Sequence, residues 1–370
     1  MNLENPFAGE DPNPYPAAAL IPFMFFQGIG TLLGLANFGL FAYLFVMATA
    51  ILYSVWATTR TSRFEHRILV LSVLIFLSPP TLAVLDRGNS AGFLVPVIIW
   101  LFHSIEKGRI SQEVIALALL SIVKPHFGFV ALAFIVFGRF QQGTRGLALG
   151  ITLNVLPFLL FWPEHFPSNL FSWLSVFLRY QEYGSVDVPW PQNISFAQFA
   201  YVFSYGLDAI LGGSLQSTLV FVREYQSLFG PLILLTVFAI IFIFRTNLTV
   251  KQVTIISISS IAMTSAISWY YYAVIAVPFL LALQKTKGSN RGKSDSCVEY
   301  RRTRSTRLES VDLVLWVGSI LTMIQFPIPG FVNEDKILAT GVFVGGTWIL
   351  VYGAILVILL QIRREKFRSI

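Results

Sequence analysis

The chain has 370 residues, of which 55% are hydrophobic and only 12% are charged, and its net charge is +7. A soluble domain carries about twice that charged fraction, and a soluble protein of this composition would expose too much apolar surface to water. The composition therefore excludes an ordinary soluble protein and indicates an integral membrane protein. The basic residues lie in short runs between apolar stretches, a distribution that the positive-inside bias explains with no nucleic-acid partner.

Twelve apolar segments follow one another along the chain, near residues 17–28, 34–57, 68–84, 91–102, 114–123, 127–137, 147–162, 229–244, 253–267, 271–283, 313–326 and 337–360. Several are shorter than the ~20 residues of a straight crossing, which is tolerated where neighbouring protein satisfies the backbone. We predict an all-α, polytopic membrane protein with about eleven transmembrane helices. Interfacial helices are expected on its outer face.

The basic residues fall in alternate connections and in the tail: Arg60, Arg63 and Arg67; Lys107 and Arg109; Arg139 and Arg145; Arg245 and Lys251; the run 285–307; and Arg363, Arg364, Lys366 and Arg368. With 114–137 taken as a hairpin, all of them lie on one side, which the positive-inside bias makes cytoplasmic. The acidic N-terminus and the segments 86–89, 163–228 and 327–336 lie on the other side. We predict a multi-pass protein of the plasma membrane with its C-terminus in the cytoplasm.

The chain divides into a membrane core at 1–284, a basic cytoplasmic loop at 285–310, and a C-terminal helix pair with a basic tail at 311–370. The core includes the outer segment 163–228. Within that segment, 169–179 reads NLFSWLSVFLR and places its apolar residues on one helical face, which predicts a helix in the membrane interface. Cys297 is the only cysteine, which excludes an intrachain disulfide and a cysteine-based metal site.

Ionisable residues near the outer ends of the segments are the candidates for chemistry, because each is costly there without a partner or a role. A carboxylate of Glu10 or Asp11 can act as a general base on a hydroxyl group; alternatively the two belong to a solvated acidic tail. Arg87, in the turn that also holds Asn89, can clamp a phosphate; alternatively it pairs with Asp86.

Lys124-Pro125-His126 interrupts an apolar stretch. Lys124 either pairs with an anion in a cavity or extends to the surface, and His126 is alternatively a hydrogen-bonded core residue. The late element with Trp269, Tyr271 and Tyr272 is either an aromatic belt at the interface or a wall for a sugar or prenyl chain.

Four short sequence elements follow one another along the chain. They are Asn5-Pro6-Phe7 with Pro14-Tyr15-Pro16-Ala17; Arg87-Gly88-Asn89; Lys107-Gly108-Arg109 through Lys124-Pro125; and Ser265-Ala266-Ile267-Ser268-Trp269-Tyr270-Tyr271-Tyr272. In this order and spacing they resemble the GT-C class of polyprenol-phosphate-sugar-dependent membrane glycosyltransferases, especially glycosyltransferase family 87. The likeness covers nearly the whole chain.

The resemblance implies a GT-C-like helical bundle. It also implies an inverting transfer of a sugar, with mannose expected, from a polyprenyl-phosphate donor to a lipid or glycan acceptor on the outer face. No cofactor and no metal are expected, and membrane lipids are the remaining partners. Our candidate residues for this chemistry are Asp11 and Glu10 for catalysis, Arg87, Asn89, Lys124 and His126 for the donor phosphate, and Tyr15, Trp269, Tyr271 and Tyr272 for the sugar or prenyl group.

The chain departs from the family pattern at two places. The family's catalytic aspartate follows a first transmembrane helix upstream of the N-P element, where this chain begins, so we expect that helix to be lacking. In the late element, Ala266 replaces the usual proline and Tyr271 the usual histidine, which leaves an inactive member as an alternative. A transporter or flippase of a lipid-linked or anionic substrate and a polysaccharide polymerase are further alternatives, although no internal symmetry favours a transporter.

Overall fold

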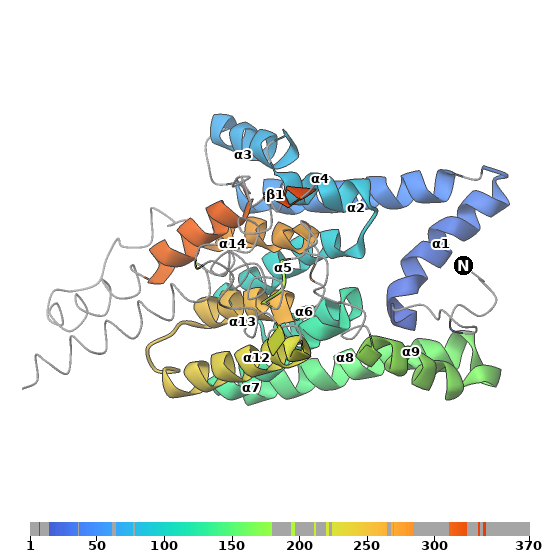
Figure 1. Ribbon diagram of the computed structural model, residues 1–370. Helices are drawn as coiled ribbons and strands as arrows, with labels where there is room; N and C mark the ends of the chain where they lie inside the picture. Colours follow the sequence, from blue (N-terminus) through green and yellow to red (C-terminus); the bar gives the residue numbers. More distant parts are fainter. Residues whose placement is uncertain are drawn as a thin grey trace, which may run out of the picture.

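The computed structural model describes residues 15–35, 37–60, 64–76, 78–179, 194–196, 224–264, 270–283 and 311–323, with short pieces at 7, 211, 220–221, 268, 332–333 and 336–337. Within these residues the fold is all-α, as predicted, apart from a short antiparallel pair of β1 (Val332–Asn333) and β2 (Lys336–Ile337) (Figure 1).

The helices are, in chain order, α1 (Ala17–Leu32), α2 (Phe38–Thr58), α3 (Phe64–Phe76), α4 (Pro79–Asp86), η1 (Ser90–Phe93), α5 (Leu94–Lys107), α6 (Ile110–Val123), η2 (Pro125–Gly128), α7 (Phe129–Phe137), α8 (Phe140–Phe161), η3 (Pro163–His165), α9 (Ser168–Arg179), α12 (Gln226–Ile243), α13 (Val250–Thr264), η4 (Tyr270–Ile275), α14 (Ala276–Leu283) and a helix at Val311–Met323. The long helix α2 runs along one side of the bundle, and α7 and α8 run along the other (Figure 1).

Three helices in the described part of the chain are long and apolar enough to cross a membrane: Phe38–Thr58, Ser90–Lys107, which joins η1 to α5, and Phe140–Phe161. They support a multi-pass membrane protein. The prediction of about eleven spans is not reproduced, because the other apolar helices, such as Ile110–Val123 and Val250–Thr264, have only 10–17 residues. A straight crossing needs about 20 residues.

Proline and glycine divide the apolar segments into these shorter helices. The expected span 68–84 is broken before Pro79, where Ser78 caps the new helix α4 by accepting a hydrogen bond from the amide of Thr81. Gly108 and Gly138 end α5 and α7 in the left-handed conformation, with φ values of 64° and 103°. Glycine adopts that conformation without steric cost and is the usual residue after a helix.

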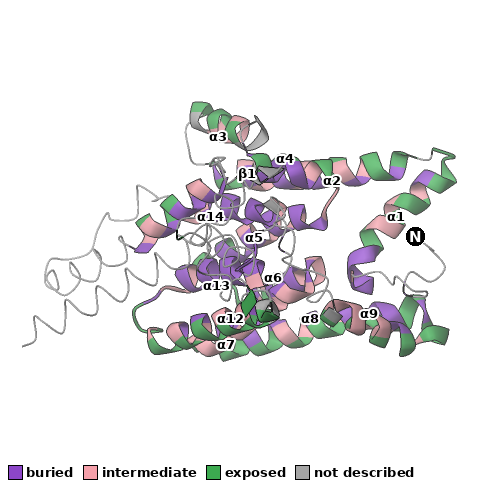
Figure 2. Ribbon diagram, viewed as in Figure 1, coloured by how far each residue is buried: buried purple, intermediate pink, exposed green. Residues whose placement is uncertain are grey.

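The most deeply buried helix is α13, in which every residue from Gln252 to Met263 is buried (Figure 2).

Close packing of α6 on α8 depends on small residues. A Cβ atom on Gly146 would lie 2.9 Å from Leu117, and one on Gly150 would lie 2.5 Å from the hydroxyl of Ser121. The absence of a side chain at these two positions therefore sets the distance between the helices.

The basic turns lie together at one end of the bundle. Arg139, between α7 and α8, pairs with Glu113 at the start of α6, where Nη1 and Oε2 are 2.5 Å apart. Lys251, at the start of α13, pairs with Glu106 near the end of α5. The α12–α13 turn thus lies beside the α5–α6 turn, and we call this the basic end.

The helix predicted at 169–179 is confirmed as α9, which continues from the end of α8 opposite the basic end (Figure 1); its place in the membrane interface stays a prediction. Its Trp173 is buried against Phe158 and Trp162 of the α8 terminus. The further interfacial helices expected within 163–228, and most of the C-terminal pair, lie outside the described residues.

Candidate functional site

Lys124 lies where the chain leaves α6, at the end of the bundle opposite the basic end. Pro125 follows it, and a residue before proline is pushed out of the helical conformation; Lys124 accordingly has φ −151° and ψ 119°. The extended backbone turns the lysine side chain into the protein, where only 6% of its surface is exposed. The lysine therefore does not extend to the surface, which was one of the two alternatives.

Two tyrosine rings surround the ammonium group of Lys124. Its Nζ atom lies 4.2 Å from the ring centroid of Tyr15 and 5.7 Å from that of Tyr272. Within the described residues, no carboxylate forms an ion pair with this lysine. Cation–π contacts contribute about 2 kcal/mol at a desolvated site, whereas burying an ion costs several kcal/mol. Burial consequently lowers the pKa of Lys124. A bound anion would supply the negative charge that compensates the ammonium group.

Asn89 connects Tyr15 to the turn between α4 and η1. Its Nδ2 atom donates a hydrogen bond of 3.4 Å to the hydroxyl of Tyr15, and its Oδ1 atom accepts one of 3.0 Å from the amide of Ala91. Burial raises the pKa of Tyr15, so the phenol keeps its proton. The site thus presents a lysine, an amide and a neutral phenol, and no negative charge among its described members.

His126 lies on the far side of Tyr272. The two ring centroids are 5.5 Å apart with the planes nearly perpendicular, and Phe127 packs against the same imidazole. The Nε2 atom is buried and has no hydrogen-bond partner among the described residues. An unpaired buried nitrogen is costly, so the alternative of a hydrogen-bonded core histidine does not hold at this atom.

Other predicted site residues fall in three groups. Tyr271 stacks beside Tyr272, with ring centroids 5.1 Å apart, and belongs to the same wall. Arg87 is exposed, and its Nε atom lies 3.8 Å from Oδ2 of Asp86, which is the alternative reading of that turn. The candidates Glu10, Asp11 and Trp269 lie outside the described residues.

Tyr43 of α2 belongs to this region and has no place in the sequence interpretation. It is 2% exposed, packs against Phe23 and Phe93, and interacts electrostatically with Tyr15. Its hydroxyl has no hydrogen-bond partner among the described residues. The sequence did hold a signal for Tyr43, because a phenol hydroxyl in the middle of a long apolar segment is unusual.

Comparison of the chain with protein-family models, curated proteins and solved structures finds no match. The chemical reading of the site therefore depends on the residues themselves. Those residues bring together a buried cation, two hydrogen-bonding groups and an aromatic wall, at the end of the bundle away from the basic turns, and this combination suits an anionic ligand.

Proposed function

We propose that the chain is a membrane glycosyltransferase that moves a sugar, with mannose expected, from a polyprenyl-phosphate donor to a lipid or glycan acceptor. The observation that carries the proposal is the buried ammonium of Lys124, which has two tyrosine rings around it and no carboxylate partner among the described residues. A phosphate diester is an anion that matches this charge. The adjoining aromatic wall offers stacking surface to a sugar.

In the proposed reaction, a hydroxyl oxygen of the acceptor attacks the anomeric carbon, and the bond from that carbon to the phosphate oxygen breaks. A carboxylate takes the acceptor proton, and Asp11 and Glu10 are the candidates. Lys124 stabilises the negative charge that develops on the departing polyprenyl phosphate. Asn89 and Tyr15 help to position the phosphate, and Tyr271 and Tyr272 line the sugar.

The sidedness of the bundle supports an outer location for this chemistry. Basic connections face the cytoplasm in multi-pass proteins, and Lys124 lies at the end away from them. We therefore assign the reaction to the outer face of the plasma membrane, with a GT-C-like bundle of more spans than the three long helices supply. The glycosyltransferase family 87 pattern is consistent with this assignment.

The test is transfer of radiolabelled mannose from polyprenyl-phosphate-mannose to lipid or glycan acceptors in membranes that contain the full chain. Lys124→Ala should lower transfer at least ~100-fold, since a lost charge-stabilising group typically costs 10²–10³ in rate. Arg145→Ala, which removes an exposed cation from the second turn of α8, is the matched control and should transfer normally. No transfer by the wild-type chain would refute the enzymatic proposal, and movement of intact donor across the bilayer without transfer would favour a flippase.

A further inference from the structure

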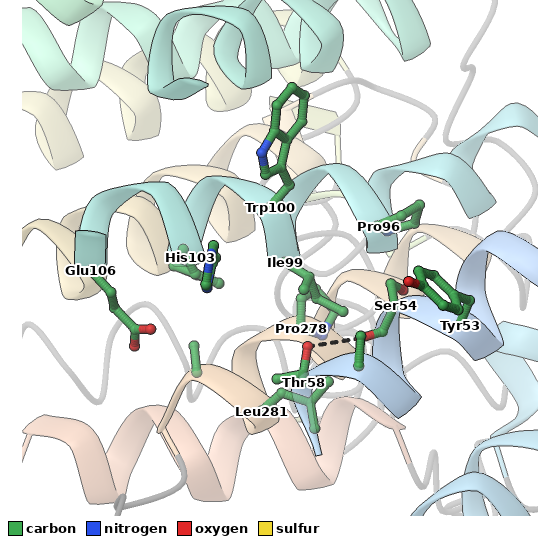
Figure 3. Close-up of a pocket in the computed structure, with 13 residues that line it drawn as sticks. Tyr53, Ser54, Thr58, Pro96, Ile99, Trp100, His103, Glu106, Pro278 and Leu281 are labelled. Carbon is green, nitrogen blue, oxygen red and sulfur yellow. Dashed lines mark hydrogen bonds between the residues drawn. The ribbon is translucent and has the colours of Figure 1, made fainter. Parts of the chain in front are cut away.

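A cavity lies at the basic end, between α2, α5 and α14 (Figure 3). It has a volume of about 510 Å³. Ala57 and Thr58 of α2 form one wall, and Leu281 of α14 contributes to another. The residues assigned to the glycosyltransferase site take no part in it. Ser90, at the start of the η1–α5 helix, bonds to the carbonyl of Val123 beside Lys124, whereas this groove reaches Glu106 at the other end of the same helix.

The residues that α5 contributes share one helical face. Pro96, Ile99, His103 and Glu106 are three or four positions apart, so their side chains lie above one another along the groove. Ten residues of α-helix rise about 15 Å, and the hydrocarbon core of a bilayer is about 30 Å thick. The groove therefore extends over about the depth of a single leaflet.

Polarity changes along the groove. Pro96, Ile99 and the uncharged phenol of Tyr53 lie at its inner end, and His103 and Glu106 lie at the end near the basic turns (Figure 3). Ser54 and Thr58 add no free donor, because each hydroxyl already donates a hydrogen bond to a backbone carbonyl of α2. A ligand that fits this gradient is apolar over most of its length and polar at the end that reaches His103.

The charges around the polar end favour an anion. Glu106 is already paired with Lys251. Arg60 follows the Thr58 wall by two positions, and Lys107 follows Glu106 directly; both are exposed. These three cations exceed the two carboxylates nearby, Glu106 and Asp312, which accepts a hydrogen bond from Gln252 beside Lys251. Anionic headgroups are attracted to such clusters by about 1 kcal/mol per basic residue.

We propose that this groove binds one anionic phospholipid from the leaflet at the basic end. Its phosphate lies near His103 and Lys107, and an acyl chain follows the α5 face toward Pro96. The site is separate from the donor site, which lies at the opposite end of the bundle. The lipid joins α2, α5 and α14, which contact one another at this end, so its binding stabilises the bundle by mass action.

The test uses the purified full chain in detergent, with native mass spectrometry to count bound lipid and thermal unfolding as a second readout. Dioleoyl phosphatidylglycerol is compared with dioleoyl phosphatidylcholine, which has the same acyl chains and no net charge. We expect one phosphatidylglycerol to be retained, with at least ~10-fold preference over phosphatidylcholine, equivalent to about 1.4 kcal/mol. Equal retention of the two lipids would overturn the assignment of an anionic headgroup.

Two variants test the position. Ala57→Trp fills the groove from the α2 wall and should reduce phosphatidylglycerol retention at least ~10-fold. Its matched control, Ala148→Trp, adds the same bulk at an exposed position of α8, away from the groove, and should retain lipid as the wild type does. If Ala57→Trp fails to fold, Ala282→Phe narrows the same groove from α14. Unchanged retention in a folded groove variant would show that the lipid binds elsewhere.

Discussion

The Nζ atom of Lys124 lies 4.2 Å from the centre of the Tyr15 ring, although the two residues are far apart in the sequence. Tyr15 immediately precedes α1, and Lys124 follows α6. The contact places Tyr15, from near the start of the described chain, against the junction between α6 and η2. Asn89 holds the same tyrosine from the turn after α4, so three separate connections meet at one cation.

Replacing Lys124 by methionine should stabilise the fold while removing the anion site. Methionine has a similar length and no amine to bury, and replacing buried charged groups by apolar ones of similar volume is neutral or stabilising by about 1–4 kcal/mol. We expect a higher thermal unfolding midpoint in detergent for Lys124→Met than for the wild type. A lower midpoint would show that the lysine has a stabilising partner and is not held for a ligand.

Binding of the donor should weaken as pH rises. Burial lowers the pKa of Lys124 in the empty site, and a phosphate beside the ammonium raises it again. Between these two pKa values binding takes up a proton, so affinity should fall by up to about tenfold per pH unit. The dissociation constant of polyprenyl-phosphate-mannose, measured between about pH 6 and 9, checks this slope, since a phosphate diester does not titrate in that range.

Two variants assign that slope to the lysine. Lys124→Arg keeps its charge throughout the range and should bind with little pH dependence. Within the described residues, the other titratable groups that face Lys124 are Tyr15, Tyr272 and His126. His126→Phe should therefore retain the slope. A flat profile for the wild type, or a slope that persists in Lys124→Arg, would contradict the role of Lys124.

The ion pair at the start of α6 should matter for stability, because Glu113 is completely buried and its Oε1 atom has no hydrogen-bond partner within the described residues. Arg139→Met leaves that carboxylate without a cation and should destabilise the protein by about 3 kcal/mol. The double variant Arg139→Met, Glu113→Gln should recover most of the loss. Urea unfolding of the wild type, the single variants Arg139→Met and Glu113→Gln, and the double variant measures the coupling, and additive effects would argue against a functioning pair.

The contact between α6 and α8 should not tolerate a methyl group at Gly150. A Cβ atom there would lie 2.5 Å from the hydroxyl of Ser121, which also accepts a hydrogen bond from Asn154. Gly150→Ala should destabilise the protein by about 1–3 kcal/mol. Gly28→Ala is the control, because nothing lies within 4 Å of its added Cβ in α1, and it should be neutral or stabilising by up to ~1 kcal/mol. Equal effects at both positions would contradict the close packing described.

Local chemistry made part of the fold predictable. The break at Lys124-Pro125, the turn at Gly88 and the helix at Asn169–Arg179 follow from proline, glycine and apolar periodicity, and the structure has all three. The number of spans was not predictable from apolar length, because Ser78 and Pro79 end one helix and cap another inside a continuous apolar run. Hydropathy does not distinguish a run that crosses the membrane from one that bends within the protein.

The sequence predicted which residues belong to the candidate site better than it predicted how they are arranged in space. Lys124, Asn89, Tyr15 and Tyr272 were each identified, and the structure brings them together. Arg87 carries the same charge as Lys124 and was given the same role, but its place in an exposed turn beside Asp86 depends on long-range packing. Tyr43 was missed for the same reason, since its burial beside Tyr15 needs α1 and α2 to pack together.

The most direct test of the central claim is equilibrium binding of polyprenyl-phosphate-mannose to the full chain in nanodiscs. Unphosphorylated polyprenol serves as the competitor that lacks the anion. The account predicts saturable binding that polyprenol does not displace, and a loss of at least ~100-fold in Lys124→Met, equivalent to about 2.7 kcal/mol. Equal affinity in the wild type and a folded Lys124→Met, or full displacement by polyprenol, would contradict a phosphate site at Lys124.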